Sequence, residues 1–441
     1  MMAKPILNPI PWIGALTLVG TAFASVTLVP MEQPTLAAAI ESSAPGDTIA
    51  IAGSVRESVV IDARRVEALV LTAAGESLAT IRPAFGDATI LTIDNRAARP
   101  FELRLERLDF RGRAGESIGI ELIDGGSPED GAATTIDLIE CSFSSLLTGV
   151  KLGAGAGARA CDPRWTAIDP SKLDRARSLI RVSRSAFVNL SGNGLELHRS
   201  EGRIDHSLFA LCGTEGIHTT AAHRLHVERN LFIRSHKAQL HLQMPGDVSV
   251  RNNLFAGAFS IEHPIGLGRI GGHGLVIDGG GDRGTVSISN NVFVANEGTG
   301  LRIAPSELFL PNEDCRTVPV RAEVRDNIFH MNGSDDAHRE RWAIYSRDGD
   351  LPGFQVEITH NLLQQDSALS NVDLDATNLL GRNPLFVDAP RDLLHFEGGM
   401  GARRAWATAF EAIRGFSLRE NSPALGSGEG QGDMGILGND W

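Results

Sequence analysis

A short pattern recurs from about residue 100 onward, and it constrains the fold more than any other feature of the chain. Each copy has a strand-like stretch in which apolar and polar residues alternate. A polar residue that is often Asn, an aliphatic residue and then Phe follow it. Phe187, Phe209, Phe232 and Phe255 follow one another at intervals of 22 or 23 residues, and later copies lie 34 to 38 residues apart, which is one repeat plus an insertion. A fixed period of this kind indicates a solenoid, in which each repeat packs only on its neighbours.

A period of 22 or 23 residues accommodates three short strands and three turns, so the sequence predicts a parallel β-helix. The Asn of each copy has two expected roles: it tolerates the left-handed conformation of a tight bend, and its amide can hydrogen-bond to the Asn above and below. The residue five positions before each Phe, or before Leu363 in the last copy, is aliphatic, and we expect it to point inward because alternate residues of a strand face opposite sides. These residues are Val182, Ile204, Val227, Val250, Ile288, Val324 and Ile358.

The copies, such as Arg229-Asn230-Leu231-Phe232 and Asn290-Asn291-Val292-Phe293, resemble those of the pectate-lyase-like superfamily of right-handed parallel β-helix proteins. The resemblance covers most of the chain. It implies an all-β, single-stranded right-handed parallel β-helix with short helical caps at both ends. A helix around Thr35 to Ser43 would cap the start, and Trp406 and Ile413 lie at helical spacing in a second helix expected to cover the far end.

The first residues are typical of an export signal. Lys4 precedes an apolar run from Ile10 to Val29, and Ala22-Phe23-Ala24 forms a small-residue cleavage site. An uncleaved anchor is the alternative, since the run approaches the length of a membrane span. We expect a signal peptide over 1–24, an N-terminal segment with the capping helix over 25–45, the β-helix over 46–389 and a C-terminal cap with closing segment over 390–441. The expected location is secreted or periplasmic.

Charge and cysteine content exclude some classes of protein. A formal net charge of -13 disfavours nucleic acid as a partner. Cys141, Cys161, Cys212 and Cys315 are too few and too scattered for a disulfide framework, although a bond between Cys161 and Cys315 stays open beside buried or free thiols. We expect no membrane contact after signal cleavage, and a monomer, because closed coils leave few free edges.

A second strand follows each Phe, usually opened by Gly and built from alternating aliphatic residues. Its intervening side chains must point outward, and stacking of the coils aligns them in a row. This predicted outward row contains Glu121, Lys151, Glu196, His218, His241, Val276, Arg302 and Tyr345.

In the superfamily that the chain resembles, the equivalent sheet floors the substrate groove, and the turns beside it supply the walls. Long insertions lie next to this strand, and loops of more than about a dozen residues are usually functional. One insertion contains Trp165, a candidate wall for sugar stacking, and another brings His263 and Arg269 near the row. With Glu121 and Glu196, these are the candidate substrate-binding residues.

The outward row fits β-elimination on an acidic, uronate-containing polysaccharide. That reaction needs a cation beside the carboxylate, a base for the C5 proton and an acid for the leaving oxygen. His218 or His241 would be the base, Arg302 and Lys151 the carboxylate partners, and Tyr345 the acid. No cofactor is expected in this interpretation. In a second interpretation, Glu196, His218 and His241 hold a divalent metal.

The remaining interpretation is an ordinary solvated face, because outward side chains of a solenoid are polar wherever water is present. The paired-Asp motif of polygalacturonases and the Asp-Pro-His-Asp of alginate epimerases are absent from the sequence. The leading hypothesis is therefore an exported β-helix protein that acts on or binds a polysaccharide, and a lyase is the enzymatic version. The alternative is a non-enzymatic surface or periplasmic solenoid that presents a rigid binding face.

Overall fold

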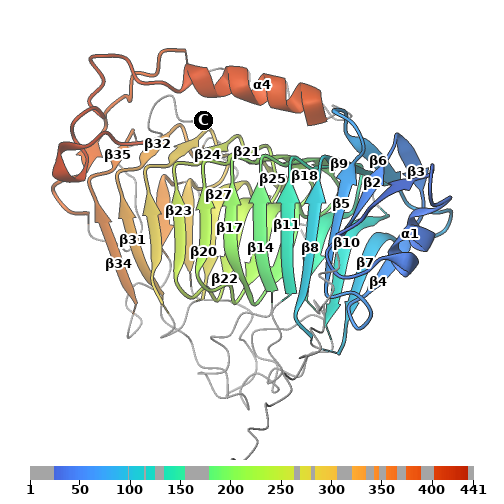
Figure 1. The fold of residues 1–441 in the computed structure, drawn as a ribbon. Helices are drawn as coiled ribbons and strands as arrows, with labels where there is room; N and C mark the ends of the chain where they lie inside the picture. The colour runs from blue at the N-terminus through green and yellow to red at the C-terminus, as the bar shows by residue number, and fades with distance from the viewer. Residues whose placement is uncertain are drawn as a thin grey trace, which may run out of the picture.

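Three long parallel sheets wind around one hydrophobic core in the computed structural model (Figure 1). The structure describes residues 24–97, 99–113, 116–124, 134–153, 178–262, 269–279, 284–304, 320–333, 342–346, 354–364, 374–388 and 402–435. Successive strands of one coil pass from sheet A to sheet B to sheet C, and the next coil pairs in register with the last. The predicted parallel β-helix is confirmed.

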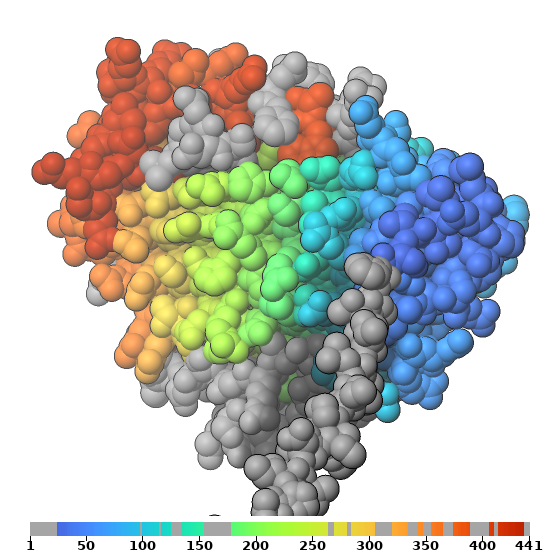
Figure 2. Space-filling view, in the orientation of Figure 1, coloured from blue at the N-terminus to red at the C-terminus, as the bar shows by residue number. Residues whose placement is uncertain are grey.

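Within the described residues sheet A has 12 strands, and it faces the viewer in Figure 1. They are β1 (Val26–Val29), β2 (Asp47–Ile51), β5 (Ala68–Ala73), β8 (Phe101–Glu106), β11 (Thr134–Ile139), β14 (Ser178–Ser183), β17 (Ser200–Asp205), β20 (Leu225–Glu228), β23 (Val248–Arg251), β28 (Val286–Ser289), β31 (Arg321–Arg325) and β34 (Gln355–Thr359). Figure 2 shows the coils as parallel bands across this face of the molecule.

Sheet B also has 12 strands in the described part of the chain, and most of them contain the recurring Phe. They are β3 (Ser54–Arg56), β6 (Ala79–Arg82), β9 (Leu108–Arg111), β12 (Ser142–Ser144), β15 (Ala186–Leu190), β18 (Leu208–Cys212), β21 (Leu231–Ile233), β24 (Leu254–Ala256), β29 (Val292–Val294), β32 (Ile328–His330), β35 (Leu362–Leu363) and β36 (Leu379–Leu380).

Sheet C, with ten strands in the ranges that the structure describes, contains the predicted outward row. They are β4 (Val59–Asp62), β7 (Thr89–Asn95), β10 (Ile118–Asp124), β13 (Thr148–Leu152), β16 (Leu195–His198), β19 (Glu215–Thr220), β22 (Ala238–Gln243), β27 (His273–Asp278), β30 (Leu301–Ala304) and β33 (Ile344–Ser346). A separate antiparallel hairpin of β25 (Ser260–Glu262) and β26 (Arg269–Gly271) precedes β27.

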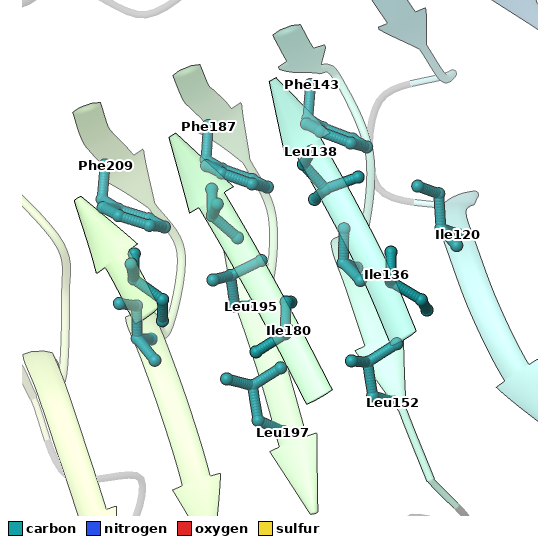
Figure 3. Packing of buried hydrophobic residues seen from close by; sticks show 14 of the residues in the cluster. Ile120, Ile136, Leu138, Phe143, Leu152, Ile180, Phe187, Leu195, Leu197 and Phe209 are labelled. Atoms are coloured by element: carbon teal, nitrogen blue, oxygen red, sulfur yellow. The ribbon is translucent and has the colours of Figure 1, made fainter. Parts of the chain in front are cut away.

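The recurring Phe residues form a continuous stack inside the cylinder. Adjacent rings are nearly parallel, with centroids 4.7 to 5.0 Å apart. Figure 3 shows three of them, Phe143, Phe187 and Phe209, at equivalent positions on consecutive coils. The aliphatic residues that the sequence placed inward, such as Val182 and Ile204, are buried as expected.

The Asn residues form the predicted ladder but are not the residues at the left-handed bend. Asn230 donates its backbone N–H and its side-chain amide to Oδ1 of Asn253, at 2.9 and 3.1 Å. Positive φ angles occur instead at the preceding residue, for example 54° at Arg229 and 56° at Asn252. The Asn side chain must enter the core to reach its neighbours, so the residue before it takes the left-handed conformation.

In the part of the chain that the structure describes, two α-helices lie beside the coils, and one of them covers an end. α1 (Leu36–Ser42) begins after Thr35, whose side chain accepts a hydrogen bond from the Ala38 N–H, and it packs on the first strands as predicted. α4 (Ala402–Gly415) contacts β12, β15 and β18, and it runs along the upper edge of the molecule in Figure 1. The expectation that this helix covers the far end was wrong. A 3₁₀ turn, η3 (Glu429–Gln431), follows it.

The position of α4 follows from the outer face of sheet B, which is apolar. Side chains such as Val188, Ala210 and Ile233 point outward there yet are fully buried. Ala405, Ala409 and other residues of the C-terminal segment pack in the same cluster. The amphipathic helix therefore covers an apolar sheet face, which would otherwise meet water.

Several expectations concern the chain ends and the cysteines. Cys141 and Cys212 are buried free thiols, and burial raises the pKa of each to about 12. Cys161, Cys315 and the export signal over 1–24, apart from Ala24, lie outside the described residues. No helix within the described ranges has the length and apolar character needed to cross a membrane.

Candidate functional site

The predicted outward row exists on sheet C. Strand pairing places Glu121 beside Lys151, Lys151 beside Glu196, and Glu196 beside His218. The row continues through neighbouring strands to Tyr345. Its remaining members are His241, Val276 and Arg302. Sequence alternation therefore predicted the register of this face correctly.

Two imidazoles meet at the centre of the row. His218 on β19 and His241 on β22 are partners in the strand register, and their ring centroids lie 4.8 Å apart. The ring planes are inclined by 77°, so one ring edge faces the other ring. Nε2 of His218 also lies 3.4 Å from Oγ1 of Thr220.

Carboxylates hold both sides of the His241 ring. Nε2 of His241 lies 3.0 Å from Oδ2 of Asp278, and Nδ1 lies 3.6 Å from Oε1 of Glu215. Arg302 donates from Nη1 to Oδ1 of the same Asp278, at 2.6 Å. The His241 side chain is 17% exposed and that of Arg302 12%, so solvent only partly screens this chain of charges.

The surroundings separate the pKa values of the two imidazoles. Burial, and then the positive charge of His241, lower the pKa of His218 to about 4. Burial acts to lower the pKa of His241 too, but the contacts with Asp278 and Glu215 outweigh it and raise that pKa to about 9. Burial is the largest single effect on Glu215 and opposes its ionisation, yet the contact with His241 and the nearby positive charges together outweigh it and lower the pKa of Glu215 to about 2. Burial likewise opposes ionisation of Asp278, but the contacts with His241 and Arg302 together outweigh it and lower the pKa of Asp278.

Near neutral pH the site therefore contains one neutral imidazole beside one imidazolium. His218 has a lone pair that can accept a proton, and His241 has a proton that it can donate. Environments that push the pKa values of two neighbouring groups apart in this way characterise general acid–base pairs.

Two important residues of the site were missed by the sequence analysis. Asp278 lies two positions after Val276 and so belongs to a second row, which also contains His198, Thr220 and Gln243. The alternation rule, applied one step further along each strand, would have found it. Glu215 precedes His218 by three residues, an odd spacing that does not indicate the same face of a strand, so alternation would not have placed it in the site.

The other candidate residues lie farther along the row. Lys151 is two strands from His218, and its Nζ lies 3.1 Å from Oε1 of Glu121. Glu196 accepts from His198, with Oε1 3.1 Å from Nε2. Tyr345 is three strands from His241, or about 14 Å at the usual strand spacing. Neither Lys151 nor Tyr345 therefore lies within hydrogen-bonding distance of the imidazole pair.

Three candidates came from insertions beside the sheet. Arg269 is on the β25–β26 hairpin, where Nη2 donates to the carbonyl of Ser260 at 2.9 Å and Nη1 lies 3.7 Å from Oε2 of Glu297. Trp165 and His263 lie outside the described residues.

The described ranges contain one group of side chains that could hold a metal ion. It consists of Glu215, His218 and His241, whose ligand atoms lie within 4.8 Å of one another. The carboxylate of this group is Glu215 and not Glu196, the residue that the sequence suggested. In the structure, both ring nitrogens of His241 face carboxylates, an arrangement that suits an imidazolium.

Comparison with known proteins supports the fold and leaves the activity open. The family model for the right-handed beta helix region matches residues 119–307. A comparison with the sequences of curated proteins found no match. Among solved structures, the periplasmic alginate epimerase AlgG has a TM-score of 0.33 and 10% identity over 71% of this chain and 77% of that chain. The Dettilon tailspike protein has a TM-score of 0.31 and 9% identity over 78% of this chain and 64% of that chain. These likenesses assign no activity to the chain.

Proposed function

Because the chain is a right-handed parallel β-helix with an imidazole pair on one outer face, we propose that it binds an acidic polysaccharide there and cleaves it by β-elimination. The observation that supports the proposal is the close approach of the His218 and His241 rings, whose centroids lie 4.8 Å apart, with carboxylates facing only the His241 nitrogens closely. These surroundings move the pKa values of the two imidazoles in opposite directions. Export, which the signal expected over residues 1–24 would direct, would bring the protein to such polymers.

His218 is the base in this proposal. Its neutral ring takes the proton from C5 of a uronate, and the electron pair of that C–H bond forms the C4–C5 double bond. His241 cannot serve as the base, because contacts with Asp278 and Glu215 keep it protonated. The structure thus supports one of the two bases that the sequence left open.

His241 is the acid. The C4–O bond breaks as the double bond forms, and the leaving oxygen takes the proton from the His241 imidazolium. Arg302 lies next to this ring through Asp278, and its positive charge stabilises the carboxylate as it becomes enolate-like. Lys151 and Tyr345, which lie farther along the row, bind neighbouring sugars and take no part in proton transfer.

The alternatives differ in what they require of these residues. A non-enzymatic solenoid has no need for two adjacent imidazoles with separated pKa values, so the site favours an enzyme. A metal centre formed by Glu215, His218 and His241 would need both rings as neutral ligands. Loss of activity on treatment with a chelator, restored by a divalent ion, would support that centre against the acid–base pair.

The activity is tested by the formation of unsaturated products, followed by their absorbance, from alginate, pectate, heparosan and unsulfated chondroitin. We expect kcat/KM to be highest between about pH 4 and pH 9. As the pH falls through about 4, His218 becomes protonated and the base is lost; as it rises through about 9, His241 loses the proton that the leaving group needs. A profile without an alkaline decline would contradict the role of His241. No unsaturated product from any of these polymers would contradict the proposed function.

A further inference from the structure

Carboxylates outnumber cations on the side of the outward row that leads from His218 toward the N-terminal coils. Glu196 is one strand away from His218, Lys151 two and Glu121 three. Lys151 and Glu121 form an ion pair, with Nζ 3.1 Å from Oε1. Glu196 contacts the imidazole of His198, whose hydrogen bond lowers the pKa of that carboxyl. Two carboxylates and one ammonium leave this part of the row with a net negative charge.

The charges at the imidazole pair itself are balanced. Glu215 and Asp278 carry negative charges, and His241 and Arg302 carry positive ones. The two cations lie where a single substrate carboxylate would react. Between the imidazole pair and Glu121, the described part of the row carries no excess of positive charge.

On the basis of the proposed function, we propose that the substrate is a polysaccharide in which uronate alternates with an uncharged sugar, and not a homopolyuronate. Every sugar of a homopolyuronate carries a carboxylate. A chain that follows the row past Glu196 would therefore place a negative charge against that side chain, and like charges a few ångströms apart repel.

An alternating polymer avoids this repulsion and can gain hydrogen bonds. If a uronate occupies the imidazole pair, its neighbour toward Glu196 is uncharged. The hydroxyl or amide N–H groups of that sugar can donate to Glu196, and a carboxylate acceptor makes such hydrogen bonds stronger than neutral ones. The formal net charge of the chain, -13, acts in the same direction, since it disfavours approach of the more densely charged polymer.

The test compares kcat/KM at low salt for an unsulfated alternating uronate–N-acetylhexosamine polymer with the values for polygalacturonate and polymannuronate of matched length. We expect at least about a tenfold preference for the alternating polymer, and a smaller one at high salt, where screening weakens the repulsion. The double variant Glu121→Gln and Glu196→Gln should raise kcat/KM on the homopolyuronates by about fivefold for each carboxylate removed. Glu323→Gln, an exposed change on β31 of sheet A, is the matched control and should leave the preference unchanged.

The outcomes separate this inference from the proposed function. Equal or faster elimination from a homopolyuronate would overturn the inference and leave the β-elimination in place. If no polymer yields an unsaturated product, the proposed function is contradicted. The affinities of the polymers for the His218→Gln variant then decide whether the protein prefers the alternating polymer. Homopolyuronates that bind this variant as tightly as the alternating polymer, with no effect of the two Glu→Gln changes, would overturn the inference on binding alone.

Discussion

Replacement of His218 by glutamine lowers kcat for polysaccharide elimination by about 10² to 10⁴, the range expected for loss of a positioned general base. Glutamine approximates the size and polarity of the ring but cannot accept a proton at neutral pH. KM should change little, because the remaining members of the outward row still bind the neighbouring sugars. Steady-state kinetics on the best polymer of the panel measures both constants.

His226→Gln provides the matched control for this variant. His226 is an exposed residue of β20 in sheet A, so the same chemical change is made on another face of the solenoid. Its kcat should equal that of the unmodified protein. If His218→Gln retained full activity, or if both variants lost activity equally, His218 would not be the base.

Replacement of Phe232 by alanine destabilises the protein by about 3–5 kcal/mol, the range for removal of a large buried ring. Phe232 is fully buried and stacks on Phe209 and Phe255, with centroids 5.0 and 4.8 Å away. Its loss leaves a cavity in the middle of the stack and removes one contact from each neighbour. The midpoint of guanidinium unfolding, followed by circular dichroism, should fall well below that of the unmodified chain.

Phe85→Ala is the control for this loss. Phe85 is 76% exposed and contacts Arg56 and Arg113 through its ring, so its removal opens no cavity in the core. We expect a change of at most about 0.5 kcal/mol, as for most surface substitutions. Equal midpoints for the two variants would contradict the role assigned to the Phe stack.

The repeat made most of the fold predictable. The Phe interval and the aliphatic residues such as Val182 determine which side chains enter the core, and a period of two then determines which face water. The register of the outward row, including the pairing of His218 with His241, was predicted correctly for this reason. The location of α4 was not, because the helical pattern around Trp406 shows that one face is apolar but not which surface that face covers.

The chemistry of the site was less predictable than its location. The two histidines look alike in the sequence, yet burial and the carboxylates of Glu215 and Asp278 give them opposite protonation states. Glu215 is the first residue of β19, three positions before His218, so alternation does not place the two residues on the same face. Tyr345 and Lys151 share the row with the histidines, but they lie three and two strands away from them, too far to meet the imidazole pair.

The central claim is that one imidazole of the pair is neutral and the other charged near neutral pH. NMR titration of the two rings, assigned with His218→Gln and with a corresponding variant of His241, measures this directly. We expect His218 to titrate near pH 4 and His241 near pH 9. Two imidazoles that both titrate near pH 6.5, the ordinary value for histidine, would contradict the acid–base pair.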